Sequence, residues 1–357
     1  MSRPIQAIID LAALRHNLAV ARQHSGTAKL FAVVKANAYG HGLLRVARAL
    51  ETADGFAVLT IEEGVQLRDA GFEQPILLLE GFFSGDELPV VAEYQLTPVI
   101  HSLEQIDSLL RSGLPTRLPV FLKCNSGMNR LGFGERAFQG ALESLQASPQ
   151  VGAITLMTHF ANADEPAGVA VQLRAFNDIV QNSALPRSLA NSAALLRFPE
   201  ARGDIVRAGI MLYGACTFAD KSPTELGLLP VMTLQSRVIA VQMLKIGDHV
   251  GYGSDFTAAR KMRIGIVACG YADGYPRHAP SGTPVLVEGV RSETVGRVSM
   301  DMLCVDLTSI PDAGVGSEVV LWGADPLVTE VAARAGTNAY ELLCALAARV
   351  PVFEHGA

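Results

Sequence analysis

Apolar residues follow two different patterns along this chain, and the change between them divides the sequence. From residue 29 to about 210, short apolar runs rich in β-branched and aromatic residues alternate with segments of helical spacing, such as 41–53. The runs are LFAVV (30–34), FAVL (56–59), PILLL (75–79), TPVI (97–100), PVFL (119–122), ITLMT (154–158), SLA (188–190) and DIV (204–206). These eight strand-and-helix units predict an N-terminal (β/α)8 TIM barrel, an α/β architecture.

An open, doubly wound sheet would show the same alternation of strands and helices. The chain contains neither G-x-G-x-x-G nor G-x-x-x-x-G-K-[ST], so the nucleotide-binding version of that fold has no support in the sequence. The barrel is therefore preferred.

After about Pro230 the pattern changes to closely spaced strand-like runs separated by Gly, Pro and Asp turns. The last part, 328–336 and 338–350, again has helical spacing. We therefore expect two domains, a barrel over residues 1–229 and a mainly β domain over residues 230–357.

Polar or ionisable residues close most of the predicted barrel strands. They are Lys35, Glu80, His101, Lys123, His159, Asn191 and Arg207. In a barrel, the carboxyl ends of all strands lie on one face, and active sites are built there. The sequence therefore predicts an active site formed by these side chains.

Composition excludes some partners. The 29 basic and 35 acidic residues give a net charge of −6, and neither sign forms a long run that could follow phosphates or anionic lipid. Neither nucleic acid nor membrane is expected as a partner, and without a signal-like apolar N-terminus a cytoplasmic location is expected. The five cysteines are widely spaced, with no C-x-x-C pair, so no metal site is expected.

The segment VVKANAYGHG (33–42) places Lys35 at the end of an apolar strand. A partly desolvated lysine amine is suited to forming a Schiff base with an aldehyde, although a lysine at a strand end can also simply extend to solvent. The string resembles the cofactor attachment site of the pyridoxal-phosphate-dependent alanine racemases (fold type III). That resemblance implies pyridoxal 5'-phosphate as the cofactor, bound through Lys35.

Two further segments resemble the same family in the same order. In KCNSGMNRLG (123–132) the resemblance implies that Lys123 is a carbamylated lysine and that Arg130 faces the substrate; a loop with a surface ion pair is the alternative. In THFANAD (158–164) it implies that His159 bonds to Arg207, whereas a lone histidine is more often structural.

VRAGIMLYG (206–214) follows the eighth predicted strand and contains Arg207. An arginine opposite the pyridine nitrogen, unlike an aspartate, would not keep that nitrogen protonated, which favours racemisation over transamination. The loops after the last two strands of a barrel commonly bind phosphate. Together with the resemblance, this implies a cofactor site formed by Tyr39, His159, Asn191, Ser192, Arg207, Gly209, Ile210 and Tyr340.

The C-terminal part contributes HVGYGSDF, GYADGYPR and VGRVSMD, whose glycines alone would indicate only hairpin turns. The resemblance implies that Tyr252 is a catalytic base and that Met300 and Asp301 bind substrate. It implies that the substrate entrance is lined by Tyr271, Arg277 and Arg297. Ser299 departs from several relatives, which have cysteine there.

The resemblance implies interconversion of L-alanine and D-alanine by two bases, Lys35 on one face of Cα and Tyr252 on the other. Tyr252 is expected from the partner chain, which makes the protein a homodimer with shared active sites. Three alternatives remain: an amino-acid decarboxylase of related fold, a non-catalytic carrier of pyridoxal phosphate, and a purely structural protein.

Overall fold

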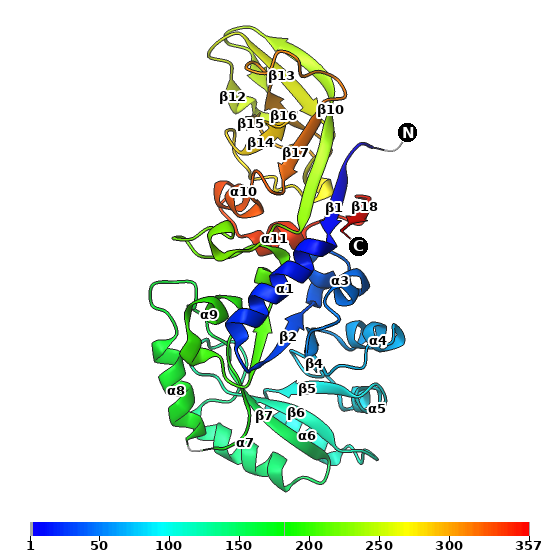
Figure 1. The fold of residues 1–357 in the computed structure, drawn as a ribbon, viewed down its shortest axis with the longest axis vertical. Helices are drawn as coiled ribbons and strands as arrows, with labels where there is room; N and C mark the ends of the chain where they lie inside the picture. Colours follow the sequence, from blue (N-terminus) through cyan, green and yellow to red (C-terminus); the bar gives the residue numbers. More distant parts are fainter. Residues whose placement is uncertain (1–2, 182, 357) are drawn as a thin grey trace. The chain divides into compact units, whose positions relative to one another are not determined.

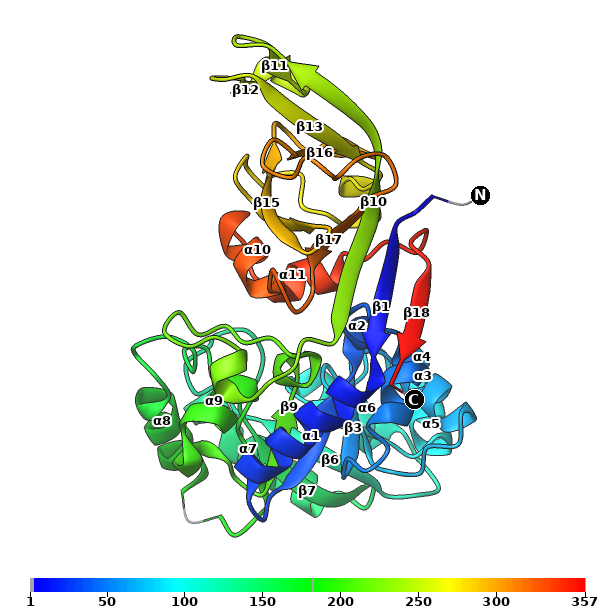
Figure 2. The ribbon, with the colours of Figure 1, turned by 45° about the horizontal axis from the view of Figure 1, so that its top comes forward.

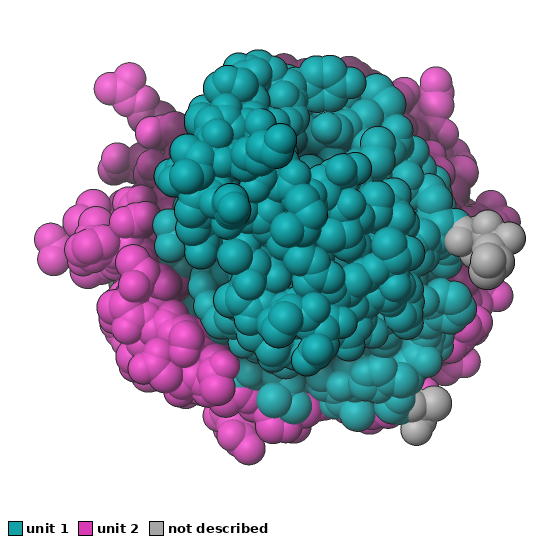
Figure 3. All heavy atoms as spheres, turned by 90° about the horizontal axis from the view of Figure 1, so that it is seen from above, with its two compact units in different colours: residues 1–14, 213–217, 228–357 teal, residues 15–212, 218–227 magenta. Residues whose placement is uncertain are grey.

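The structure, a computed structural model, describes residues 3–181 and 183–356 and divides into two compact units. One unit contains Arg15–Leu212 and Phe218–Gly227, and we call it the barrel unit. The other contains Met1–Leu14, Tyr213–Thr217 and Leu228–Ala357, and we call it the β unit (Figure 3). Residues 1, 2, 182 and 357 of the expected domains lie outside the described part.

Eight parallel strands close the barrel in sequence order, with the last pairing to the first (Figure 1). The strands are β2 (Lys29–Val33), β3 (Gly55–Val58), β4 (Ile76–Leu78), β5 (Leu96–Ile100), β6 (Leu118–Lys123), β7 (Val151–Met157), β8 (Arg187–Ser188) and β9 (Ile205–Ala208). Each of the eight predicted apolar runs overlaps one of them. The predicted (β/α)8 barrel is confirmed.

Burial explains why these strands are continuous apolar runs. Every residue of β3, β4 and β5 is buried, because strands of a parallel barrel are covered on both faces. The helices of the barrel region are α1 (Leu11–Ser25), α2 (Lys35–Tyr39), α3 (Leu43–Ala49), α4 (Ile61–Asp69), α5 (Leu88–Glu93), α6 (Leu103–Arg111), α7 (Glu135–Ala147), α8 (Ala170–Val180) and α9 (Ser192–Arg197).

The β unit is built mainly from antiparallel pairs around one long strand, β10 (Met232–Leu244). Its sheet has the order β13-β16-β15-β14-β17-β10-β1-β18, and β13 also pairs with β10, which closes six of the strands into a ring. The strands are β13 (Met262–Val267), β14 (Pro284–Val287), β15 (Val290–Val295), β16 (Leu303–Asp306), β17 (Glu318–Trp322) and β18 (Val352–His355), with the pair β11 (His249–Val250) and β12 (Phe256–Thr257). The mainly β C-terminal architecture is confirmed.

The first strand, β1 (Gln6–Asp10), lies between β10 and β18 (Figure 2). It pairs antiparallel with β10 and parallel with β18. Residues 1–14 therefore group with the β unit, whereas the expected border at 229 and 230 places them with the barrel.

Short elements complete the chain. The 3-10 helices are η1 (Gly85–Glu87), η2 (Pro199–Ala201), η3 (Ile210–Tyr213), η4 (Thr224–Leu226), η5 (Tyr252–Ser254) and η6 (Tyr271–Asp273). The predicted helical tail contains α10 (Val328–Arg334) and α11 (Ala339–Cys344). Among the described residues, no helix combines the length and apolar character needed to span a bilayer.

Candidate active site

Lys35 lies two residues after the end of strand β2 and begins an unusual turn. The four residues after it, Ala36–Tyr39, all have φ between 52° and 55°, a left-handed conformation that non-glycine residues rarely adopt. Local bonds hold this turn: Gly40 N–H donates to Ala36 O at 3.1 Å and Leu43 N–H donates to Asn37 Oδ1 at 2.9 Å. Backbone strain of this kind concentrates at functional sites, and here it fixes the position of Lys35 and Tyr39.

His41 supports the same turn from inside the protein. Its ring is fully buried, and Nδ1 donates to Tyr39 O at 2.8 Å and lies 3.1 Å from Ala38 O. Burial lowers the pKa of His41 to about 4, so the ring is neutral at pH 7.

Tyr39, Ser192 and Gly209 converge at the carboxyl ends of β2, β8 and β9. The Ser192 hydroxyl accepts the Gly209 N–H at 2.8 Å, and a Cβ at Gly209 would lie only 2.7 Å from Tyr39 Oη. Ile210 follows and begins η3. The absent Cβ therefore leaves a cradle of hydroxyl and backbone N–H groups, the donor set that a phosphate requires.

Asn191 lies beside this cradle, but its side chain is bonded to backbone groups. Its Oδ1 accepts the Ala194 N–H at 3.0 Å and caps α9, and its Nδ2 donates to Phe160 O at 3.2 Å. Its expected role in binding a cofactor stays a prediction.

Arg207, in β9, is 3% exposed and surrounded by neutral acceptors. Its Nη1 donates to Ser188 Oγ at 2.7 Å, and its Nη2 lies 2.9 Å from Thr158 O, 3.2 Å from Leu189 O and 3.3 Å from His159 Nδ1. Among the described residues, no carboxylate contacts this guanidinium. Burial lowers the pKa of Arg207 to about 10, so it remains a buried cation at neutral pH.

His159, in contrast to Arg207, is neutral at pH 7. Burial first, and then the charge of Arg207, hold the pKa of His159 well below its usual range. The contact between these two residues was expected from the sequence. The acceptors Ser188, Thr158 and Leu189 were not, because two of them act through backbone carbonyls, which no side-chain motif reveals.

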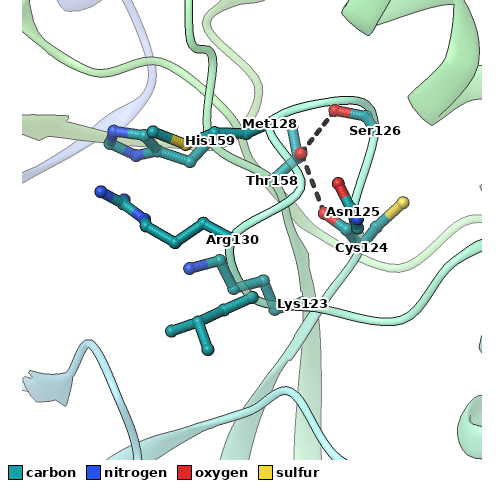
Figure 4. Close-up of a pocket in the computed structure, with 9 residues that line it drawn as sticks. Lys123, Cys124, Asn125, Ser126, Met128, Arg130, Thr158 and His159 are labelled. Carbon is teal, nitrogen blue, oxygen red and sulfur yellow. Dashed lines mark hydrogen bonds between the residues drawn. The ribbon is translucent and has the colours of Figure 1, made fainter.

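Lys123, the last residue of β6, lines a small pocket with Arg130, Met128 and His159 (Figure 4). The side chains of Lys123, Arg130 and His159 extend to the same side of the loop after β6, whereas the Thr158 hydroxyl bonds away from them, to Ser126 and Cys124 O. Burial, followed by the charges of Arg207 and Arg130, lowers the pKa of Lys123 to about 8. The amine is therefore partly unprotonated near neutral pH.

This end of the barrel carries an excess of positive charge. The positive charges of Lys35, Arg130 and Arg207 all lower the pKa of Lys123. Glu80 is the one carboxylate among the groups that shift this pKa, and it raises it. His101 is half-buried and bonded through Nε2 to Glu80 O at 3.0 Å; burial lowers its pKa, so the neutral ring adds no further positive charge. Such a site is suited to a ligand with several negative charges.

The predicted site residues of the β unit are mostly exposed. The exposed fractions are 72% for Tyr252, 37% for Tyr271 and 53% for Met300, and Arg277 and Arg297 are also exposed. Tyr252 begins η5. Asp255, the residue directly after η5, forms an ion pair with Arg297. Tyr340 is half-buried in α11.

The fold and the site together define a class: a (β/α)8-barrel protein with basic side chains gathered at the carboxyl ends of its strands, and a mainly β unit formed largely by the C-terminal part of the chain. Residues 9–217 match the family model "Alanine racemase, N-terminal domain", and residues 231–353 match "Alanine racemase, C-terminal domain". The chain belongs to the alanine racemase family.

Individual relatives are similar over nearly their whole length. The chain is 58% identical to an alanine racemase of Nitrosospira multiformis, covering 98% of this chain and 99% of the relative. It is 53% identical to "Alanine racemase, catabolic" of Klebsiella aerogenes, covering 99% of each. The crystal structure of the biosynthetic alanine racemase of Pseudomonas aeruginosa superposes with a TM-score of 0.96 at 47% identity, covering 99% of each chain. Since one relative is named catabolic and another biosynthetic, these names leave the metabolic role open.

Proposed function

We propose that this chain is an alanine racemase that interconverts L-alanine and D-alanine with pyridoxal 5'-phosphate as cofactor. The observation that carries the proposal is the buried Arg207, held by neutral groups beside neutral His159. A guanidinium in this position would offer a hydrogen bond to a ring nitrogen of the cofactor and would not give up a proton to it. This is the requirement for a racemase, in contrast to an enzyme that stores charge in the cofactor ring.

The residues present fit the cofactor. Lys35 would bind it covalently, and the cradle of Tyr39, Ser192, Gly209 and Ile210 would hold its phosphate together with Tyr340. His159, Asn191 and Arg207 complete the proposed cofactor site. When bound, pyridoxal phosphate withdraws electrons from the substrate Cα and so makes its proton removable.

The chain's own residues then supply binding and proton transfer. Lys35 and Tyr252 act as acid and base on opposite faces of Cα, because racemisation removes a proton from one face and returns one to the other. Arg130, with the backbone of Met300 and Asp301, holds the substrate carboxylate. Tyr271, Arg277 and Arg297 line the entrance.

Lys123 is proposed to carry a carbamate. Its lowered pKa leaves an unprotonated amine, which adds to carbon dioxide with release of one proton. The product is an anion beside Arg130, and it offsets the positive charge that the amine would otherwise add to the site.

The active enzyme is proposed to be a homodimer in which Tyr252 belongs to the site of the partner chain. Its 72% exposure in the single chain supports this, because a catalytic phenol needs a surrounding site. The 1–229 barrel domain would then bind the cofactor, and the 230–357 domain would complete the other subunit's site. The cytoplasmic location expected from the sequence stays a prediction.

The test measures both directions of racemisation with the purified holoenzyme. Lys35→Ala should lose nearly all activity, whereas Lys29→Ala, which removes an exposed lysine at the other end of β2, should retain it. Borohydride should attach the cofactor to Lys35. Full activity of Lys35→Ala, or release of carbon dioxide from the amino acid without racemisation, would contradict the proposal.

A further inference from the structure

The turn formed by residues 270–274 is wedged between two other segments of the β unit. A Cβ at Gly270 would lie 2.3 Å from Ser299 O and 2.4 Å from Met300 O. A Cβ at Gly274, whose φ is 106°, would lie 2.4 Å from Ala345 O. Both glycines of the GYADG motif are therefore required by close approach. We call residues 270–274 the wedge turn.

Asp273 is the charged centre of this turn, and its side chain is completely buried. It accepts the Gly270 N–H at 2.9 Å, Arg3 Nη2 at 2.8 Å and Arg349 Nε at 2.7 Å. Burying a carboxylate is unfavourable unless it is fully paired, and here both oxygens have cationic partners. Loss of either arginine would therefore leave part of this buried negative charge without a partner.

The same two arginines continue to Asp301. Arg349 Nη2 donates to Asp301 Oδ1 at 2.7 Å, and Arg3 Nη2 donates to Asp301 O at 2.9 Å. Each arginine thus bridges a buried carboxylate and the segment that contains Met300 and Asp301.

Two backbone bonds add to these bridges. Tyr271 N–H donates to Ser299 O at 3.1 Å, and Ala272 N–H donates to Met300 O at 2.9 Å. The wedge turn therefore holds residues 299–301 through both backbone and charge.

We propose that Asp273 and Arg349 are positioning residues, which fix the Met300–Asp301 segment and so set how tightly the enzyme binds the carboxylate of its substrate. This inference rests on the proposed function, which makes Met300 and Asp301 substrate residues. The Arg349 and Asp301 side chains are 42% and 41% exposed, so their pair alone would contribute little. Anchoring Arg349 on buried Asp273 gives the pair a fixed geometry.

The experiment compares Arg349→Met with Arg291→Met in the holoenzyme. Arg291 is a matched control, because it is also a partly exposed arginine of the β unit that bridges two carboxylates, Asp325 and Glu330. Arg349→Met should raise KM for alanine by about three- to tenfold with kcat changed less than about twofold, as expected when an interaction made equally in ground and transition state is lost. Arg291→Met should change neither constant.

Hydrogen exchange gives a readout that does not depend on catalysis. In Arg349→Met the amides of Tyr271 and Ala272 should exchange faster than in Arg291→Met, because their acceptors Ser299 O and Met300 O are released. Arg349→Lys should give an intermediate KM, since an ammonium lacks the planar set of N–H donors with which the guanidinium reaches both carboxylates. If the methionine variant does not fold, the lysine variant is measured in its place.

An unchanged KM for Arg349→Met or Arg349→Lys would overturn the inference, as would unchanged exchange at Tyr271 and Ala272. A fall in melting temperature and kcat with KM constant would also overturn it, because that result describes a structural role only. If the wild-type protein does not racemise alanine, the proposed function fails, and the exchange rates still decide whether Arg349 holds the segment.

Discussion

Replacing Gly209 with alanine tests the proposed phosphate cradle without measuring activity. The new Cβ would lie 2.7 Å from Tyr39 Oη but 3.6 Å from Tyr39 Cζ and 3.7 Å from Val33 Cβ. The clash therefore involves the hydroxyl oxygen alone. Tyr39 is buried and lies in the left-handed turn after Lys35, so it has little freedom to move away.

Two opposing effects set the size of the change. Overpacking of this kind costs about 1 to 3 kcal/mol, whereas a Gly to Ala change stabilises by about 0.4 to 1 kcal/mol through the unfolded chain. In the wild-type background the clash dominates, and Gly209→Ala should destabilise the protein. In a Tyr39→Phe background the hydroxyl is absent, and the same change should be neutral or stabilising.

Urea unfolding of the four cofactor-free proteins measures this double-mutant cycle. The coupling energy should be about 1 to 3 kcal/mol in favour of the double variant. Titration with pyridoxal phosphate should also show weaker binding for both single variants. The geometry is refuted if Gly209→Ala changes the free energy of unfolding equally in the wild-type and Tyr39→Phe backgrounds. Equal here means a coupling energy below about 0.5 kcal/mol.

Three more predictions follow from other parts of the site. Burial lowers the pKa of His41 from about 6.5 to about 4, so as the pH falls the unfolded chain takes up a proton on His41 before the folded protein does. The free energy of unfolding should therefore fall by about 1.4 kcal/mol per pH unit between pH 6.5 and about 4. His41→Asn should flatten that slope in urea unfolding experiments. Carbamate formation at Lys123 needs the unprotonated amine, so the carbon-13 carbamate signal in labelled bicarbonate should increase as the pH rises through about 8, and Lys123→Ala should lack it. Mixing Lys35→Ala subunits with Tyr252→Phe subunits should recover about a quarter of wild-type activity, because about half of randomly paired dimers are mixed and each mixed dimer has one intact site of its two. If mass measurement proves that the subunits exchange but no activity is recovered, the shared site is wrong.

The barrel was predictable because its signal is local. Strands such as β3 and β5 are buried on both faces and therefore stand out as continuous apolar runs. Parallel topology then places Lys35, Lys123 and Arg207 at one end of the barrel without any knowledge of side-chain contacts. The gathering of these three residues at one end of the barrel could thus be predicted from the sequence.

The contacts of the site could not be predicted in the same way. The left-handed turn after Lys35 consists of ordinary residues, Ala-Asn-Ala-Tyr, with no glycine to mark it. The partners of Asp273 come from opposite ends of the chain, at Arg3 and Arg349. Hydrophobic periodicity reports which face of an element is buried, but it does not report which distant charge lies opposite.

The pairing of β1 also determines the order in which this chain can fold during synthesis. All eight strands of the barrel lie between residues 29 and 208, so the barrel can close while the ribosome is still making β10 to β18 of the β unit. Strand β1 is synthesised before the barrel strands, whereas its two neighbours, β10 and β18, are synthesised after them. At about 5 to 20 residues per second, β1 waits on the order of half a minute with its buried-face residues Ala7 and Ile9 exposed. During that interval, β1 of the nascent chain is open to chaperones and to mispairing with another chain.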